Sequence, residues 1–145
     1  AALKIDEEWK RSQRFHLPLS LMLIDIGDAA ARVPEGPSRR ALLAEVAAVF
    51  LNECRDIDVL ARFAPTVFLL LLPGTGAAGA EVLATRILAV LRDRLRDLPG
   101  IAPACGVTTI PSADVPDRKA FLGVAEACLR RAQAGGAGGV CTTWQ

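Results

Sequence analysis

Short, dense apolar runs alternate with longer amphipathic stretches along this chain. Leu17–Ile26 is almost wholly apolar, which favours a central strand buried on both faces. Val67–Leu72 is a second apolar run, and the segment before it, Asp58–Phe63, alternates between polar and apolar residues. Because only Ala64-Pro65-Thr66 separates these two segments, they predict an antiparallel hairpin. Further strands are predicted at Ile101–Ile110 and Val140–Thr143.

Apolar side chains at helical spacing predict helices between these strands. Gly27–Pro37 is rich in glycine, proline and small residues and predicts a loop, after which Ser38 is a suitable N-cap. The resulting order is a helix followed by β-α-β-β-α-β-α-β, which predicts an α+β fold with helices packed around a mixed central sheet. The predicted helices are Leu3–Phe15, Ser38–Cys54, Ala77–Leu98 and Asp117–Gln133.

The length of 145 residues fits one domain. We divide it into a lead-in helix or stalk end at 1–16 and the domain proper at 17–145, with Trp9 and Trp144 expected to anchor its two ends. The chain begins at Ala1 without a Met or a signal sequence, so we expect it to be a domain of a longer protein that includes an upstream domain.

Composition narrows the classes of function. Lys plus Arg number 17 against 16 acids, a net charge of +1, which argues against a nucleic-acid polymer or an anionic membrane as partner. No apolar run approaches the roughly 20 residues of a membrane helix, so we expect a cytoplasmic domain, or the cytoplasmic part of a membrane-attached protein. With one histidine, His16, and no CxxC, a zinc site is disfavoured. Reduced, mostly buried thiols are expected at Cys54, Cys105, Cys128 and Cys141.

Four segments, in this order and spacing, carry a family resemblance. They read LSLMLIDI at 19–26, DVLARFAPTVFLLLLP at 58–73, ACGV at 104–107, and the closing stretch 125–140. Together they resemble the GGDEF domain of diguanylate cyclases, bacterial enzymes that join two GTP molecules into cyclic di-GMP. The resemblance covers nearly the whole chain and implies the fold predicted above.

The departures from the family motif imply that the domain is not a cyclase. Ala64-Pro65-Thr66-Val67-Phe68 stands in place of Gly-Gly-Asp/Glu-Glu-Phe, so Pro65 obstructs the approach to phosphates and Val67 cannot bind a metal. Asp25 is the one carboxylate left in the first metal motif, and Gln133 falls on the phosphate-binding lysine position. Because phosphoryl transfer depends on charge neutralisation, we expect no catalytic residues, no metal and no cofactor.

One ligand site of the family is retained in the sequence. Arg55-Asp56-Ile57-Asp58 matches the R-x-x-D of the inhibitory product site, and Arg86 matches a further arginine on the next helix. An arginine can donate two hydrogen bonds to guanine O6 and N7, while a carboxylate can accept from N1–H and N2–H. The plainer alternative for Arg55 and Asp58 is a surface ion pair worth about 0–1 kcal/mol. The second R-x-x-D, Arg94–Asp97, is expected to be a solvated helix face.

The first hypothesis is therefore a catalytically inactive GGDEF domain that binds cyclic di-GMP through Arg55, Asp58 and Arg86, as a single molecule or an intercalated pair. It would serve as a bacterial second-messenger receptor in a larger protein, for example in exopolysaccharide, biofilm or motility control, and binding could cross-link a homodimer. The alternative is a ligand-free structural or dimerisation module with the same fold. Residual cyclase activity is disfavoured by Pro65 and Val67.

Overall fold

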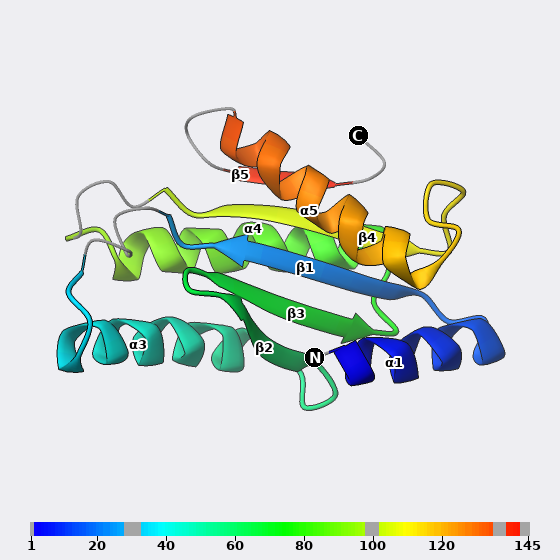
Figure 1. Cartoon of the computed structure of the whole chain (residues 1–145), viewed down its shortest axis with the longest axis horizontal. Coiled ribbons are helices and arrows are strands. Elements are labelled where there is room, and N and C mark those ends of the chain that lie inside the picture. Colours follow the sequence, from blue (N-terminus) through cyan, green and yellow to red (C-terminus); the bar gives the residue numbers. More distant parts are fainter. Residues whose placement is uncertain (1, 28–32, 98–101, 135–138, 143–145) are drawn as a thin grey trace.

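A computed structural model describes residues 2–27, 33–97, 102–134 and 139–142. Its centre is a five-stranded sheet in the order β2-β3-β1-β4-β5 (Figure 1). The strands are β1 (Leu19–Asp25), β2 (Val59–Ala64), β3 (Val67–Pro73), β4 (Ala104–Ile110) and β5 (Gly139–Thr142). The helices of the described residues are α1 (Ala2–Phe15), α3 (Pro37–Glu53), α4 (Ala77–Arg94) and α5 (Arg118–Ala134).

The sheet is mixed, as the sequence predicts. β1 pairs antiparallel with both β3 and β4, β2 and β3 form the predicted hairpin, and β5 runs parallel to β4. The register places Asp25 opposite Val67 and Val59 opposite Leu71, so the two ends of the hairpin lie at opposite ends of the strands. The predicted α+β class and order of elements are confirmed.

Helices cover both faces of the sheet, because successive strand residues point to opposite sides. Met22 and Ile24 pack into the core shared with α3 and α4, whereas Leu21 and Leu23 pack into the core shared with α1 and α5. Figure 1 shows α5 in front of the sheet and α4 behind it. This double coverage explains why the middle strands are apolar at nearly every position.

Helix α5 approaches the sheet closely at Gly106 on β4. A Cβ built at this residue would lie 2.3 Å from the Leu129 nitrogen and 2.4 Å from the Ala125 oxygen. Because both atoms belong to the helix backbone, no side-chain movement could relieve the clash. Gly106 is thus the residue that allows α5 to lie against β4.

Some sequence expectations change in detail. Ser38 is not the N-cap of α3: Gly36, at φ 121°, takes that place, and Pro37 begins the helix. A proline suits the first turn because its missing N–H would have no partner there. The helix predicted to end at Leu98 instead ends at Arg94, where Leu95 is its C-cap.

Helix α1 packs on the domain rather than standing apart from it. Ile5 is buried, and the rings of Trp9 and Phe121 lie 5.6 Å apart. The expected anchor Trp144 lies outside the described residues. All four cysteines are free thiols, with Cys105 and Cys128 buried. None of the described helices combines the length and the hydropathy needed to cross a membrane.

Candidate functional site

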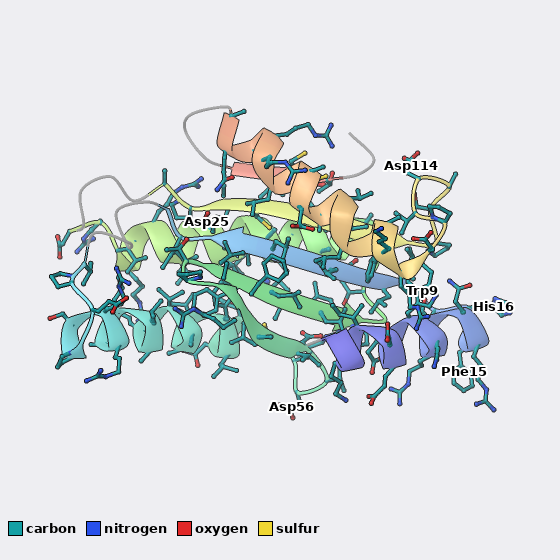
Figure 2. All side chains as sticks on the ribbon, viewed as in Figure 1. Trp9, Phe15, His16, Asp25, Asp56 and Asp114 are labelled. Atoms are coloured by element: carbon teal, nitrogen blue, oxygen red, sulfur yellow. The ribbon has the colours of Figure 1, made fainter. Side chains whose placement is uncertain are left out.

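The three predicted ligand residues come from three neighbouring parts of the fold. Arg55 follows the end of α3, Asp58 directly precedes β2, and Arg86 lies in the middle of α4. A turn closes between the first two, since the Asp58 N–H donates to the Arg55 carbonyl at 3.0 Å. We call Arg55, Asp58 and Arg86 the RxxD cluster. Figure 2 labels Asp56, which marks the turn of this cluster.

The buried carboxylate of Asp58 fixes the position of Arg55 by hydrogen bonds. Arg55 Nη2 donates to Asp58 Oδ1 at 2.9 Å, and the Arg55 backbone N–H donates to Asp58 Oδ2 at 2.8 Å. The Asp58 side chain is 2% exposed, whereas the Arg55 side chain is 51% exposed. In this geometry the carboxylate orients the arginine, and the arginine is the group that faces solvent.

The end of β3 gives Arg55 two further contacts that the sequence did not reveal. Arg55 Nη2 donates to the Pro73 carbonyl at 2.8 Å and to Thr75 Oγ1 at 2.7 Å. Thr75 is itself held to β1, because Ser20 Oγ donates to the Thr75 carbonyl at 2.8 Å. Among the described residues no protein partner is recorded for Arg55 Nη1, so that edge of the guanidinium is open.

Arg86 is held by a different carboxylate. Its Nε donates to Glu53 Oε2 at 3.1 Å, and its Nη2 donates to the Glu53 carbonyl at 3.4 Å. The Arg86 side chain is 50% exposed and that of Glu53 is 23% exposed. Sequence reasoning missed Glu53; its place two residues before the R-x-x-D was the available signal.

The Cys54 thiol is influenced by four charged side chains, those of Glu53, Arg55, Asp58 and Arg86. Burial, then the carboxylates of Asp58 and Glu53, raise the pKa of Cys54 to about 11, while Arg55 and Arg86 oppose the shift. The thiol therefore stays neutral at physiological pH and is not a nucleophile there. Cys54 stands in the chain between Glu53, which pairs with Arg86, and Arg55, which pairs with Asp58, and both guanidinium groups are half-exposed.

The far end of the hairpin has a different character. Asp25 Oδ1 accepts from the Gly27 N–H at 2.9 Å, and Asp25 Oδ2 accepts from Gln133 Nε2 at 2.8 Å. Val67, opposite Asp25 in the register, packs with the core shared by α1 and α5. We call Asp25, Val67 and Gln133 the turn-end group; Figure 2 labels Asp25 well away from Asp56.

Residues of the turn-end group do not fit a divalent metal. Mg²⁺ requires several oxygen ligands, and here one carboxylate stands beside a valine and an amide that donates to it. Nowhere in 2–27, 33–97, 102–134 and 139–142 do three or more His, Cys, Asp or Glu side chains form a group that could hold a metal ion.

The turn of the hairpin is also occupied by protein contacts. Arg62 donates to the carbonyls of Ala64 and Pro65, at 3.2 Å and 2.8 Å. The Ile26 N–H donates to the Thr66 carbonyl at 3.0 Å. These contacts fix the turn against β1, with a proline where an approaching phosphate would need a backbone N–H.

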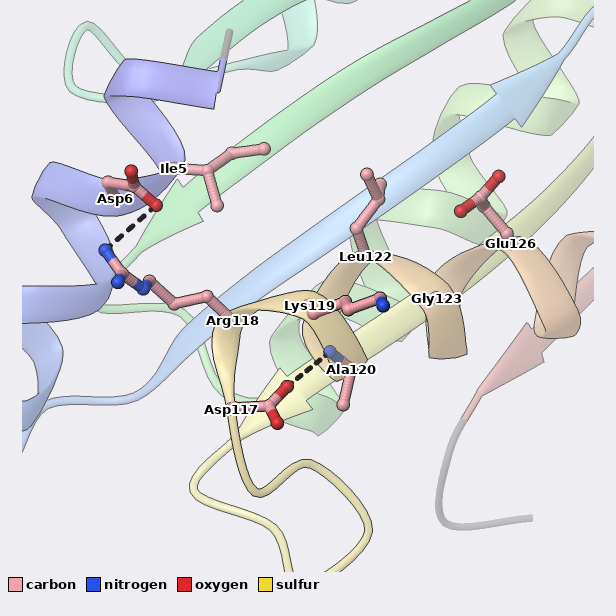
Figure 3. A pocket seen from close by; sticks show the side chains of 9 residues that line it. All are labelled: Ile5, Asp6, Asp117, Arg118, Lys119, Ala120, Leu122, Gly123 and Glu126. Atoms are coloured by element: carbon pink, nitrogen blue, oxygen red, sulfur yellow. Dashed lines mark hydrogen bonds and ion pairs between the residues drawn. The ribbon is translucent and has the colours of Figure 1, made fainter.

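Other features noted in the sequence have ordinary surface roles. The second R-x-x-D, Arg94–Asp97, lies at the exposed end of α4. Arg96 there pairs with the preceding Asp93 at 3.3 Å, and both side chains are largely exposed. His16 is also exposed, at the end of α1. A groove of about 700 Å³ lies between α1 and α5. At this groove Asp6 and Arg118 form an ion pair of 3.1 Å, drawn as a dashed line in Figure 3. The groove is lined by other residues than the RxxD cluster.

Comparison with known proteins adds the identity of the fold. No family model and no curated protein matches the chain. Among solved structures, the active GGEEF domain of a Vibrio cholerae diguanylate cyclase matches with 22% identity and a TM-score of 0.79, covering 96% of this chain and 91% of that one. The GGDEF domain of DgcB from Caulobacter crescentus, in complex with c-di-GMP, matches with 16% identity and a TM-score of 0.85, covering 98% and 87%. The chain has the GGDEF fold.

Within this fold, segment 64–68 covers the end of β2, the turn at Pro65 and Thr66, and the start of β3. The FimX GGDEF domain from Pseudomonas aeruginosa is a further match, with 18% identity and a TM-score of 0.76 over 96% of this chain and 88% of that one. The fold is thus related to that of diguanylate cyclases, and the function rests on this chain's own residues.

Proposed function

We propose that this chain is a catalytically inactive GGDEF domain that binds cyclic di-GMP through Arg55 and Arg86, with Asp58 positioning Arg55. The observation that carries the proposal is the arrangement of two half-exposed guanidinium groups beside one turn, one of them fixed by a buried carboxylate. Groups already oriented lose little entropy when a ligand binds, which favours affinity.

The chemistry of the ligand matches these groups. Cyclic di-GMP carries two phosphates and two guanines, and a guanidinium can pair with a phosphate or with guanine O6 and N7. The open Nη1 edge of Arg55 faces away from Asp58, which supports contact by the arginine rather than by the carboxylate. The proposed receptor acts within a larger regulatory protein, where binding shifts the equilibrium between its states.

The absence of catalysis is supported by the turn-end group. Asp25 has Val67 opposite it and an amide as its side-chain partner, so the described residues of that end do not supply the charge needed to hold metal and triphosphate. A ligand-free structural or dimerisation module is the second candidate. It is favoured by one observation: Arg55, Asp58 and Arg86 are all paired with charged groups of the protein.

Titration calorimetry with cyclic di-GMP separates the two. We expect micromolar or tighter binding to the wild type, a loss of at least about tenfold in Arg55→Ala and Arg86→Ala, and a similar loss in Asp58→Ala because Arg55 is released. Arg94→Ala, which removes the exposed arginine of the second R-x-x-D, is the matched control and should bind like the wild type. A folded wild type without binding heat would leave the structural module; product formed from GTP and Mg²⁺ would overturn the inactivity.

A further inference from the structure

The two arginines of the RxxD cluster are held in different ways. Asp58 is buried beneath Arg55 and leaves the outer edge of its guanidinium open. Glu53, in contrast, is partly exposed and bonds the Nε of Arg86, while its own carbonyl accepts from Nη2. Glu53 therefore occupies one edge of the cation that a phosphate would seek.

The carboxylate of Glu53 is not explained by the needs of its helix. Glu53 is the last residue of α3, and no basic side chain lies in that last turn. A negative charge at a helix C-terminus faces the negative end of the helix dipole and is mildly unfavourable there. The described partner that compensates it is Arg86, on the neighbouring helix.

Resting on the proposed function, we propose that Glu53 sets the affinity of the site, as a counter-ion that competes with the ligand phosphate for Arg86. In the ligand-free protein the Glu53 carboxylate neutralises Arg86. A bound dianionic ligand must displace that carboxylate or lie beside it, and either event opposes binding. The wild-type affinity is then lower than the two arginines alone would give, so a higher ligand concentration is needed to fill the site.

Neutralising Glu53 tests this directly. Glu53→Gln keeps the shape and a hydrogen-bond acceptor but removes the charge, so cyclic di-GMP should bind about three- to tenfold tighter in calorimetry. Asp56→Asn is the matched control, because it removes one charge from the same turn without freeing Arg86, and it should change the affinity by less than about twofold.

A double-mutant cycle isolates the mechanism. If Glu53 acts through Arg86, Glu53→Gln should give no gain in affinity when Arg86 is already alanine. Equal gains in Glu53→Gln and Asp56→Asn, or a gain that persists without Arg86, would overturn the inference.

The same titrations distinguish the failure of this inference from failure of the proposed function. Absence of binding in the wild type and in every variant would reject the receptor itself. Binding that Arg55→Ala removes and Glu53→Gln leaves unchanged would reject only the role of Glu53. Thermal unfolding of each variant checks that the domain remains folded.

Discussion

The two ends of the β2–β3 hairpin differ in their charged side chains and in the partners of those side chains. At the turn end, Asp25 faces an apolar residue and an amide. At the RxxD end, Glu53, Arg55, Asp58 and Arg86 gather around one thiol, with each cation held by a carboxylate. The family resemblance locates a catalytic site at the first end and a product site at the second. Among the described residues, ion pairs between side chains are found at the second of these two ends.

One fold thus carries two different arrangements: a carboxylate bonded to an amide at the turn end, and an ordered polar cluster at the RxxD end. About six strand residues separate the two ends, a distance of roughly 20 Å. At that distance exposed charges are strongly screened. The turn-end group takes its contacts from β1, β3 and α5, whereas the RxxD cluster takes its contacts from α3, α4 and the end of β3.

The largest effect is expected where α5 meets the sheet. Gly106→Ala drives a methyl group into the backbone of α5, which should lower the free energy of unfolding by about 3 kcal/mol in urea denaturation. Because α5 carries Gln133 and not the RxxD cluster, the folded variant should keep the wild-type reactivity of Cys54 towards iodoacetamide.

Gly123→Ala is the matched control for this change. Gly123 lies on α5 itself, where an added Cβ meets nothing within 4 Å beyond its own stretch of helix, so the change should raise stability by about 0.5–1 kcal/mol. A change in Cys54 reactivity in Gly106→Ala would show that the two ends are coupled through the sheet.

How far the sequence predicts this molecule depends on the range of the interaction. Strand patterns and the R-x-x-D are local, so the fold class and the turn from Arg55 to Asp58 could be read from the chain. The bond between Arg86 and Glu53 joins residues 33 apart, and Arg55 reaches Thr75 over 20. Only the packing of α3 beside α4, and of the α3–β2 turn beside the end of β3, decides such pairs.

Adding an acid at position 67 tests how the turn end tolerates a second negative charge. Val67→Glu places a second carboxylate opposite Asp25 and should be less stable than Val67→Gln, its uncharged isostere, by about 0.5–1 kcal/mol. Mg²⁺ should close this gap in thermal unfolding, because two neighbouring carboxylates attract a divalent ion. The gap should persist in the presence of a chelator.

The expected activity of both Val67 variants is nil, since Pro65 and Gln133 still stand where the resemblance implies phosphate-binding groups. Synthesis of cyclic di-GMP from GTP by Val67→Glu would show that the turn end lacks a single acid only. The lack of catalysis at the turn end would then depend on a single substitution.

The smallest effect concerns the thiol at the RxxD end. Alkylation of Cys54, followed by peptide mass spectrometry, should have its midpoint near pH 11 in the folded domain and near 9.0 in denaturant. Since the folded pKa lies above the unfolded one, the thiol's contribution to stability is complete below pH 9 and is lost as the pH rises towards 11.

Cys54→Ala should remove this loss of stability at alkaline pH. Glu53→Gln should lower the midpoint, because Glu53 helps to raise the pKa. A folded midpoint at or below 9.0 would mean that the thiol is neither buried nor close to the carboxylates of Asp58 and Glu53, and this end would then lack the ordered cluster.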